Sequence, residues 1–191
     1  MNFFSKAEGF NTKLFYITGR NYPVDIYYLD KPCKDYIQAA IDTCISIHSN
    51  SPKNSGDILV FLTGQEEINN FLEKSESGGL KRNDILIYPL FAGLNIDRQL
   101  EVFTPTPHNK RKIIVSTNIA EASVTIDNIA YVVDSCFVKL KFNNHLTDSD
   151  SLFVLPASKF SLDQRAGRAG RVRGNLIIYF SWQMLSFMSA N

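Results

Sequence analysis

The chain has 191 residues, which is enough for one domain with a full hydrophobic core and too few for two domains of ordinary size. Hydrophobic residues make up 45% of it and charged residues 20%, a composition that excludes an intrinsically disordered segment. The formal net charge is only +1, so binding to a polyanion would depend on a local basic patch and not on bulk charge.

Cysteine and histidine, the residues that most often crosslink chains or hold metals, show no supporting pattern. The three cysteines are Cys33, Cys44 and Cys136. They are odd in number and too far apart for a CxxC pair, which argues against a disulfide framework or a zinc site and predicts a reducing compartment. The histidines lack ligand spacing and are interpreted as structural or surface residues: His48, His108 and His145. No stretch reaches the roughly 20 apolar residues of a membrane span, and the N-terminus does not resemble a signal peptide. We therefore expect a soluble intracellular domain.

Short β-branched and aromatic runs alternate with helical patterns along the chain. The runs predict strands at 14–18, 24–29, 58–62, 85–90, 113–116, 131–133, 137–142, 152–155 and 176–180. The helical patterns lie at 35–48, 65–74, 96–102 and 161–171. Runs such as 58–62 are apolar throughout, as expected for strands that are buried on both faces of a parallel sheet. This alternation predicts an α/β fold with a mainly parallel sheet flanked by helices.

Three stretches interrupt the alternation of strands and helices. Residues 49–56 and 73–83 are polar and predict loops. Residues 137–156 contain two β runs around a polar centre, which predicts a projecting β-hairpin.

The strand predicted at 58–62 leads into Thr63 and Gly64 and then into a helical pattern. Ligands gather at the carboxyl ends of strands in open parallel sheets, and a hydroxyl beside a glycine would allow a phosphate backbone to come close. A plain strand-to-helix turn with Thr63 as the N-cap explains the same residues, and this segment alone favours it.

The strand predicted at 113–116 is followed by Thr117, Asn118, Glu121 and Asp127, with mostly small or aliphatic residues between them. Hydroxyl, amide and carboxylate groups at a strand end suit a polar ligand. The alternative is local: Thr117 or the serine before it would cap a short helix, and Asp127 would begin a turn.

The segment from Gln164 to Arg171 carries an arginine at every third position. Ser161 and Gln164 fit a capping box, so a helix is predicted to start near Ser161, and Arg165, Arg168 and Arg171 would then fan across one helix face. Each interior glycine costs about 1 kcal/mol against alanine, and cations early in a helix oppose its dipole. The segment therefore predicts a phosphate ligand in front of it. The alternative is a solvated basic helix, or one that touches a nucleic-acid backbone.

These three segments, 61–68, 116–123 and 164–171, resemble in order and wording motifs IV, V and VI of superfamily 2 helicases. They are most similar to the DEAH-box ATP-dependent RNA helicases. The resemblance covers almost the whole chain and implies a RecA-like fold. Residues 24–29 and 137–141 resemble a spliceosome-associated branch of that family, which implies messenger-RNA splicing and a nuclear location, with the cytoplasm as the alternative.

The sequence contains no Gly-x-x-x-x-Gly-Lys-Ser/Thr loop for phosphates and no Asp-Glu-x-His to hold magnesium. In the family both belong to the first RecA-like lobe. The resemblance therefore implies that residues 19–191 are the second lobe alone, and that residues 1–18 are the tail of the interlobe connection with the entering strand. Residues 19–24 resemble the family's entry into that lobe. ATP with Mg²⁺ is the implied cofactor, and the magnesium ligands are expected in the first lobe.

The resemblance also implies roles for individual residues. Gln164 would position the attacking water, and Arg168 and Arg171 would be arginine fingers, each of which can contribute roughly 10³–10⁵ in rate. Arg165 would hold its helix to neighbouring elements. The implied nucleotide-binding residues are an aromatic ring on the base, a serine that senses nucleotide state and two neighbours of the ribose: Phe103, Ser123, Thr125 and Asp127.

The implied RNA-binding residues contact phosphates through hydroxyl and backbone groups and read no sequence: Thr63, Gly64, Gly93 and Thr117. Besides RNA, the implied partners are the first RecA-like lobe and the C-terminal domains of the same protein, together with spliceosomal or activator proteins, and no membrane. The hairpin departs from the family pattern, because acids at Asp148 and Asp150 stand where relatives carry basic residues. Acids repel phosphate, so we predict no direct RNA contact by the tip.

The leading hypothesis is therefore half of an enzyme, which by itself is expected to bind nucleotide weakly and to hydrolyse none. A non-catalytic RNA-binding or protein-docking module on a degenerate helicase scaffold is the second hypothesis. The intact Gln164, Arg168 and Arg171 disfavour it. A translocase that acts on DNA shares the same motifs and ranks third.

Overall fold

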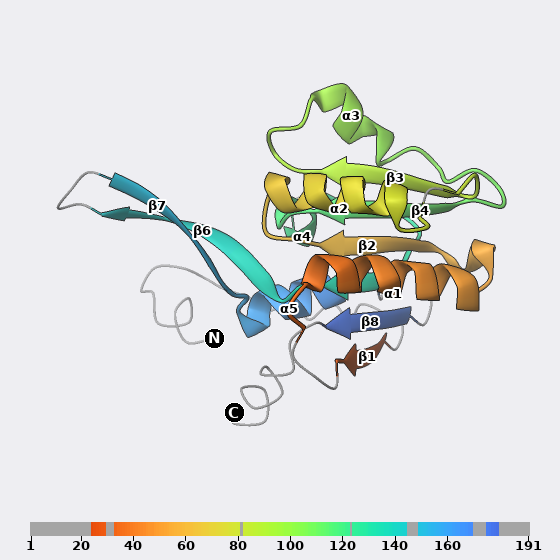
Figure 1. Ribbon diagram of the computed structural model, residues 1–191, viewed down its shortest axis with the longest axis horizontal. Helices are drawn as coiled ribbons and strands as arrows, with labels where there is room; N and C mark the ends of the chain where they lie inside the picture. Colours follow the sequence, from red (N-terminus) through yellow and green to blue (C-terminus); the bar gives the residue numbers. More distant parts are fainter. Residues whose placement is uncertain are drawn as a thin grey trace, which may run out of the picture.

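The computed structural model describes residues 24–29, 33–80, 82–122, 124–144, 149–169 and 175–179. Within them, six parallel strands form one sheet in the order β1-β8-β5-β2-β4-β3 (Figure 1). The strands are β1 Val24–Tyr28, β2 Asp57–Phe61, β3 Ile85–Leu90, β4 Arg111–Ser116, β5 Ile129–Asp134 and β8 Asn175–Tyr179. The predicted α/β fold with a parallel sheet is confirmed. The entering strand predicted at 14–18 lies outside the described residues.

Helices cover both faces of the sheet (Figure 1). They are α1 Tyr36–Asn50, α2 Gln65–Ser77, α3 Ile96–Glu101, α4 Ile119–Ala122 and α5 Lys159–Ala166. The core forms two clusters, one between α1, α2 and the sheet and the other between α4, α5 and the sheet. Side chains alternate along the buried strand β2, so Ile58 and Val60 join the first cluster while Leu59 and Phe61 join the second.

Two predicted helix ends and two predicted loops need correction. α2 continues to Ser77, so the loop predicted at 73–83 is wrong over its first residues. α1 runs to Asn50 and a 3-10 turn covers Lys53–Ser55, so only part of 49–56 is irregular. Surface helix ends and loops share the same polar composition, so the sequence alone does not distinguish them.

α5 begins at Lys159, not near Ser161 as the capping box predicted. Ser158 is the N-cap, and its hydroxyl oxygen accepts a 3.2 Å hydrogen bond from the backbone N–H of Ser161. The helix ends at Ala166, so it is shorter than the predicted 161–171. Two serines three residues apart both suit a cap, and the chain uses the earlier one.

The predicted hairpin is confirmed as a two-stranded antiparallel sheet, β6 Phe137–Asn144 and β7 Ser149–Pro156. It projects well beyond the main sheet (Figure 1). Its base is fixed where the N–H of Ala157 donates to the carbonyl of Cys136 at 2.8 Å. Of the acids near the tip, Asp148 lies outside the described residues, while Asp150 pairs with Lys141 at 2.6 Å.

Candidate functional site

The four predicted RNA-binding residues follow the carboxyl ends of three neighbouring strands. Thr63 and Gly64 follow β2, Thr117 follows β4, and Gly93 follows β3. Backbone hydrogen bonds continue between the strands at this edge: the N–H of Leu62 donates to the carbonyl of Ser116 at 2.9 Å, and that of Thr117 to the carbonyl of Leu90 at 3.1 Å. The sheet thus brings these residues together, at the edge where open parallel sheets hold their ligands.

Thr63 is not the N-cap that the local interpretation predicted. The cap of α2 is Gly64, and no side chain bonds to the helix end from that position. The backbone N–H of Thr63 instead donates to Glu67 Oε2 at 2.9 Å, and Glu67 also accepts a hydrogen bond from the hydroxyl of Tyr36. Because Glu67 fixes the backbone here, the side chain of Thr63 is not used to cap the helix.

Lys139 of β6 lies over the same edge, and the sequence did not identify it as a site residue. A Cβ placed on Gly64 would lie 3.6 Å from Lys139 Cδ and 3.9 Å from its Nζ. The nearest carboxylate, on Glu66, is 3.8 Å from Nζ and almost fully exposed, so this ion pair contributes little. The hairpin therefore places an ammonium group beside Gly64. Only the approach of β6 to the turn after β2 reveals this position, which the alternating pattern of β6 does not indicate.

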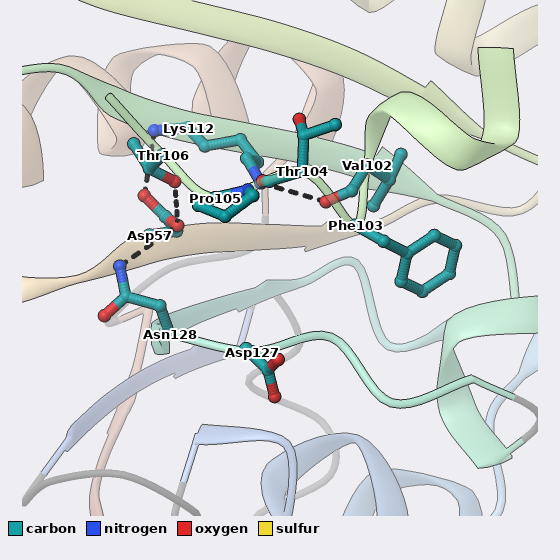
Figure 2. A pocket seen from close by; sticks show the side chains of 9 residues that line it. All are labelled: Asp57, Val102, Phe103, Thr104, Pro105, Thr106, Lys112, Asp127 and Asn128. Carbon is teal, nitrogen blue, oxygen red and sulfur yellow. Dashed lines mark hydrogen bonds between the residues drawn. The ribbon is translucent and has the colours of Figure 1, made fainter.

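A cavity of about 370 Å³ lies beside the amino-terminal ends of β2, β4 and β5 (Figure 2). Phe103 and Asp127, both predicted to bind nucleotide, line this one cavity although 24 positions separate them. Phe103 follows α3 and its ring is 42% exposed. Thr125 is exposed two residues before Asp127. Ser123 lies outside the described residues. The structure thus unites an aromatic ring and a carboxylate on the walls of one cavity.

A buried polar cluster holds the wall of this cavity in place. The carboxylate of Asp57 accepts hydrogen bonds from the backbone N–H of Lys112 at 2.9 Å, from Thr106 Oγ1 at 2.6 Å and from Asn128 Nδ2 at 3.2 Å. Lys112 Nζ donates to the carbonyl of Val102 at 2.9 Å. Burial lowers the pKa of Lys112, and the charge of Asp57 opposes that shift. Asp57 and Lys112 were not predicted from the sequence, because each lies at the amino-terminal end of a strand whose centre is apolar.

Motif VI does not form the continuous helix that would fan its arginines across one face. Arg165 lies in the last turn of α5, Arg168 in the turn that follows it, and Arg171 outside the described residues. Gln164 is half-buried on α5. The break comes at Gly167, which ends the helix as a C-cap.

Arg165 holds α5 to its neighbours, as the resemblance implied. Its guanidinium is buried and donates to Glu121 Oε2 at 3.0 Å and to Asp134 Oδ1 at 2.8 Å. It also lies 5.0 Å from the centre of the Phe61 ring. Burial raises the pKa of Asp134, although the charge of Arg165 opposes the shift. Two carboxylates and one guanidinium therefore join α4, α5 and the end of β5.

Arg168 is also buried, and its guanidinium points to backbone carbonyls of its own lobe. Nε donates to the carbonyl of Glu121 at 2.9 Å, and Nη1 donates to that of Val124 at 2.6 Å. Val124 begins the segment that reaches Asp127 at the cavity. A short piece of chain therefore connects the arginine to the cavity wall.

The described residues contain no group of three His, Cys, Asp or Glu side chains arranged to hold a metal ion. None of the helices in the described part of the chain is long and apolar enough to cross a membrane.

A RecA-like parallel sheet that gathers helicase motifs at its edges defines a motor lobe of the helicase class. Residues 36–173 match the model of the helicase conserved C-terminal domain, and the chain belongs to that family. It is similar to the crystal structure of the Escherichia coli DExH-box NTPase HrpB, with 30% identity and a TM-score of 0.77 over 88% of this chain. A second structure, of the Escherichia coli DEAH/RHA helicase HrpB, matches with 30% identity and a TM-score of 0.78 over 89% of the chain. The chain spans about a fifth of HrpB, 20% and 21% in the two structures. The resemblance to the DEAH-type helicases is confirmed.

Proposed function

We propose that this chain is the second motor lobe of an ATP-dependent RNA helicase and that a first lobe of the same protein holds ATP and Mg²⁺ against it. Phe103, Asp127 and Arg168 support this proposal, because the residue next to each of them packs in the core cluster on the side of the sheet that α4 and α5 cover: Val102, Ile126 and Ala169. This face would meet the first lobe. RNA would lie along the strand-end edge at Thr117 and Gly93.

The cavity suits the base and ribose of a nucleotide. The half-exposed ring of Phe103 can stack on any base, and the carboxylate of Asp127 can accept hydrogen bonds from ribose hydroxyls. Neither contact selects one base, which agrees with relaxed nucleotide choice. The magnesium ligands would come from the first lobe.

In the proposed cycle, Arg168 and Arg171 reach the γ-phosphate when the two lobes close, and Gln164 positions water. Their positive charge would stabilise the charge that develops on the transferred phosphoryl group. Closure moves RNA held at the strand ends of this lobe relative to the first lobe. Loss of the γ-phosphate removes the shared ligand and lets the cleft reopen.

The test is RNA-stimulated ATP hydrolysis by the full-length protein, with wild type beside Arg168→Ala and Arg168→Lys. We expect both variants to lose roughly 10³-fold or more in turnover while they still bind RNA. Because Arg168 is buried, thermal melts must show that each variant is folded. No turnover by the wild type, with RNA still bound, would favour the non-catalytic scaffold. Turnover at the wild-type rate in both variants would show that Arg168 is not an arginine finger.

The burial of Arg168 is the observation that favours the non-catalytic alternative. A guanidinium that bonds only within its own lobe would serve the fold and not a phosphate. The thermal melts separate the two roles. A purely structural Arg168 lowers the melting midpoint in both variants, whereas an arginine finger lowers turnover in a protein that stays folded.

The compartment and the pathway are proposals that rest on the likeness of 24–29 and 137–141 to spliceosome-associated helicases. A nuclear role in splicing, with spliceosomal or activator proteins as partners, predicts that the tagged full-length protein concentrates in the nucleus and co-purifies with spliceosomal RNA. A cytoplasmic signal without such RNA would contradict it.

A further inference from the structure

Glu121 lies one helical turn after Thr117, at the point where α4 meets α5. The N–H of Ala120 donates to the carbonyl of Thr117 at 3.3 Å, and the N–H of Glu121 donates to that of Asn118 at 2.9 Å. α4 is therefore a closed turn that begins at the strand end proposed to face RNA. A displacement of Thr117 carries Glu121 with it.

The carboxylate of Glu121 forms hydrogen bonds to two residues of α5. Oε1 accepts a hydrogen bond from Ser161 Oγ at 2.6 Å, and Oε2 accepts one from Arg165 Nε at 3.0 Å. The Glu121 side chain is only 13% exposed. Charge-assisted hydrogen bonds away from solvent are the strong ones, so α4 and α5 move as a unit at this contact.

The backbone of the same residue holds Arg168. The Glu121 carbonyl accepts hydrogen bonds from Nε of Arg168, at 2.9 Å, and from its Nη2. The main chain of Glu121 thus contacts Arg168, the proposed arginine finger. Its side chain contacts α5, the helix that precedes Arg168. Glu121 therefore accepts hydrogen bonds from both arginines, from Arg165 Nε at 3.0 Å and from Arg168 Nε at 2.9 Å.

Arg165 does not depend on Glu121 for charge compensation. Asp134 accepts from its Nη1 at 2.8 Å, and the Phe61 ring lies beneath the guanidinium. A neutral amide at position 121 therefore leaves Arg165 paired with a carboxylate. The fold can survive a change that weakens the link from α4 to α5, which makes the role of Glu121 separable from stability.

We propose that Glu121 is a positioning residue that couples the RNA-facing end of β4 to Arg168. The inference rests on the proposed function, in which Thr117 contacts RNA and Arg168 reaches the γ-phosphate. RNA at Thr117 shifts α4, and Glu121 moves α5 and the Arg168 turn with it. The guanidinium then leaves the carbonyls of its own lobe and becomes available to the nucleotide.

The test is Glu121→Gln in the full-length protein, measured as the ratio of RNA-stimulated to RNA-free ATP turnover. We expect the ratio to fall about tenfold, as for loss of one charged hydrogen bond, while RNA affinity and melting midpoint stay near wild type. Glu73→Gln, on the exposed face of α2, is the matched control and should keep the wild-type ratio. A wild-type ratio in Glu121→Gln overturns the proposal, as does a loss of RNA binding and melting midpoint together, which would assign a structural role.

Hydrogen exchange separates this proposal from the proposed function. If the wild type hydrolyses no ATP, the helicase function fails, yet Glu121→Gln must still raise amide exchange in residues 159–169. Exchange in β2 and β4 must stay unchanged. Unchanged exchange in 159–169 would overturn the positioning role whatever the turnover shows.

Discussion

Lys112 Nζ lies 2.9 Å from the carbonyl oxygen of Val102, so a buried ammonium on β4 fixes the residue directly before Phe103. Asp57 holds the same loop from β2 through Thr106. The exposed ring of Phe103 is thereby attached to a rigid base. A ring that is ordered before a ligand arrives loses little entropy on stacking.

Replacing Phe103 by alanine should raise the KM for ATP about tenfold, because stacking a base on an aromatic ring is worth about 1–3 kcal/mol. The ring is 42% exposed, so the melting midpoint should stay near wild type. Phe103→Trp should keep the KM. Leu100→Ala, at a position 56% exposed on α3, is the control. Steady-state kinetics on the full-length protein measure the KM. An unchanged KM in Phe103→Ala would mean that the base does not stack on Phe103.

Lys139→Gln should weaken RNA binding and reduce its dependence on salt. If the ammonium over Gly64 contacts one phosphate, the slope of log K against log salt should fall by about 0.7 for single-stranded RNA. Lys110→Gln, just before the amino-terminal end of β4, is the control and should keep the slope. Titrations at several salt concentrations measure both variants. Equal slopes in Lys139→Gln and wild type would mean that this lysine contacts no phosphate.

Arg165→Met should destabilise the lobe by about 3–5 kcal/mol, the usual cost of leaving a buried charge without its partner. The change leaves the carboxylates of Glu121 and Asp134 next to each other with no guanidinium between them. Arg98→Met, on the exposed side of α3, should have a small effect. Urea denaturation compares the free energies of unfolding. A loss no larger than that of Arg98→Met would show that the cluster does little for the fold.

Acidification from neutral pH to about 5 should destabilise the lobe through His48. Burial lowers the pKa of His48 from 6.5, and the hydrogen bond to Asp84 only partly opposes this. Below pH 6.5, His48 takes up a proton in the unfolded chain but stays neutral in the folded state. The free energy of unfolding therefore falls as the pH drops toward the pKa of His48 in the folded state.

His48→Gln should flatten this pH dependence. Asp84 does not confuse the test, because its hydrogen bond to Lys53 lowers its pKa to about 2 and its contribution is lost only at lower pH. Melting midpoints of both proteins across the pH range decide the matter. Equal pH dependence in wild type and His48→Gln would exclude His48 as the cause.

Hydrophobic pattern alone predicted the sheet well. β3 was predicted with its observed bounds, and β2 within one residue at each end, because buried strands are continuous apolar runs. The order of the strands and the positions of the helix ends depend on contacts between residues that are far apart in sequence. The start of α5 at Lys159 and the end of α2 at Ser77 were therefore missed.

Part of the candidate site was predictable from the resemblance to the helicases. Thr117 and Gly93 were expected at strand ends, and the sheet places both there. The supporting residues were not predicted, because Asp57 and Lys112 look like ordinary polar residues at the starts of strands until their partners are known. Lys139 depends on where the hairpin base lies, which no local pattern encodes.

The base of the hairpin directly precedes the start of α5 in the chain. β7 ends at Pro156, and Ser158 caps α5 only two residues later, while β6 starts beside the end of β5. Eight extended residues reach about 26 Å, and the edge-to-face rings of Phe142 and Phe153 stiffen them. Only two residues, at positions 157 and 158, separate the hairpin from α5. The direction in which the hairpin projects is therefore tied to the N-terminus of the helix that leads to Arg168.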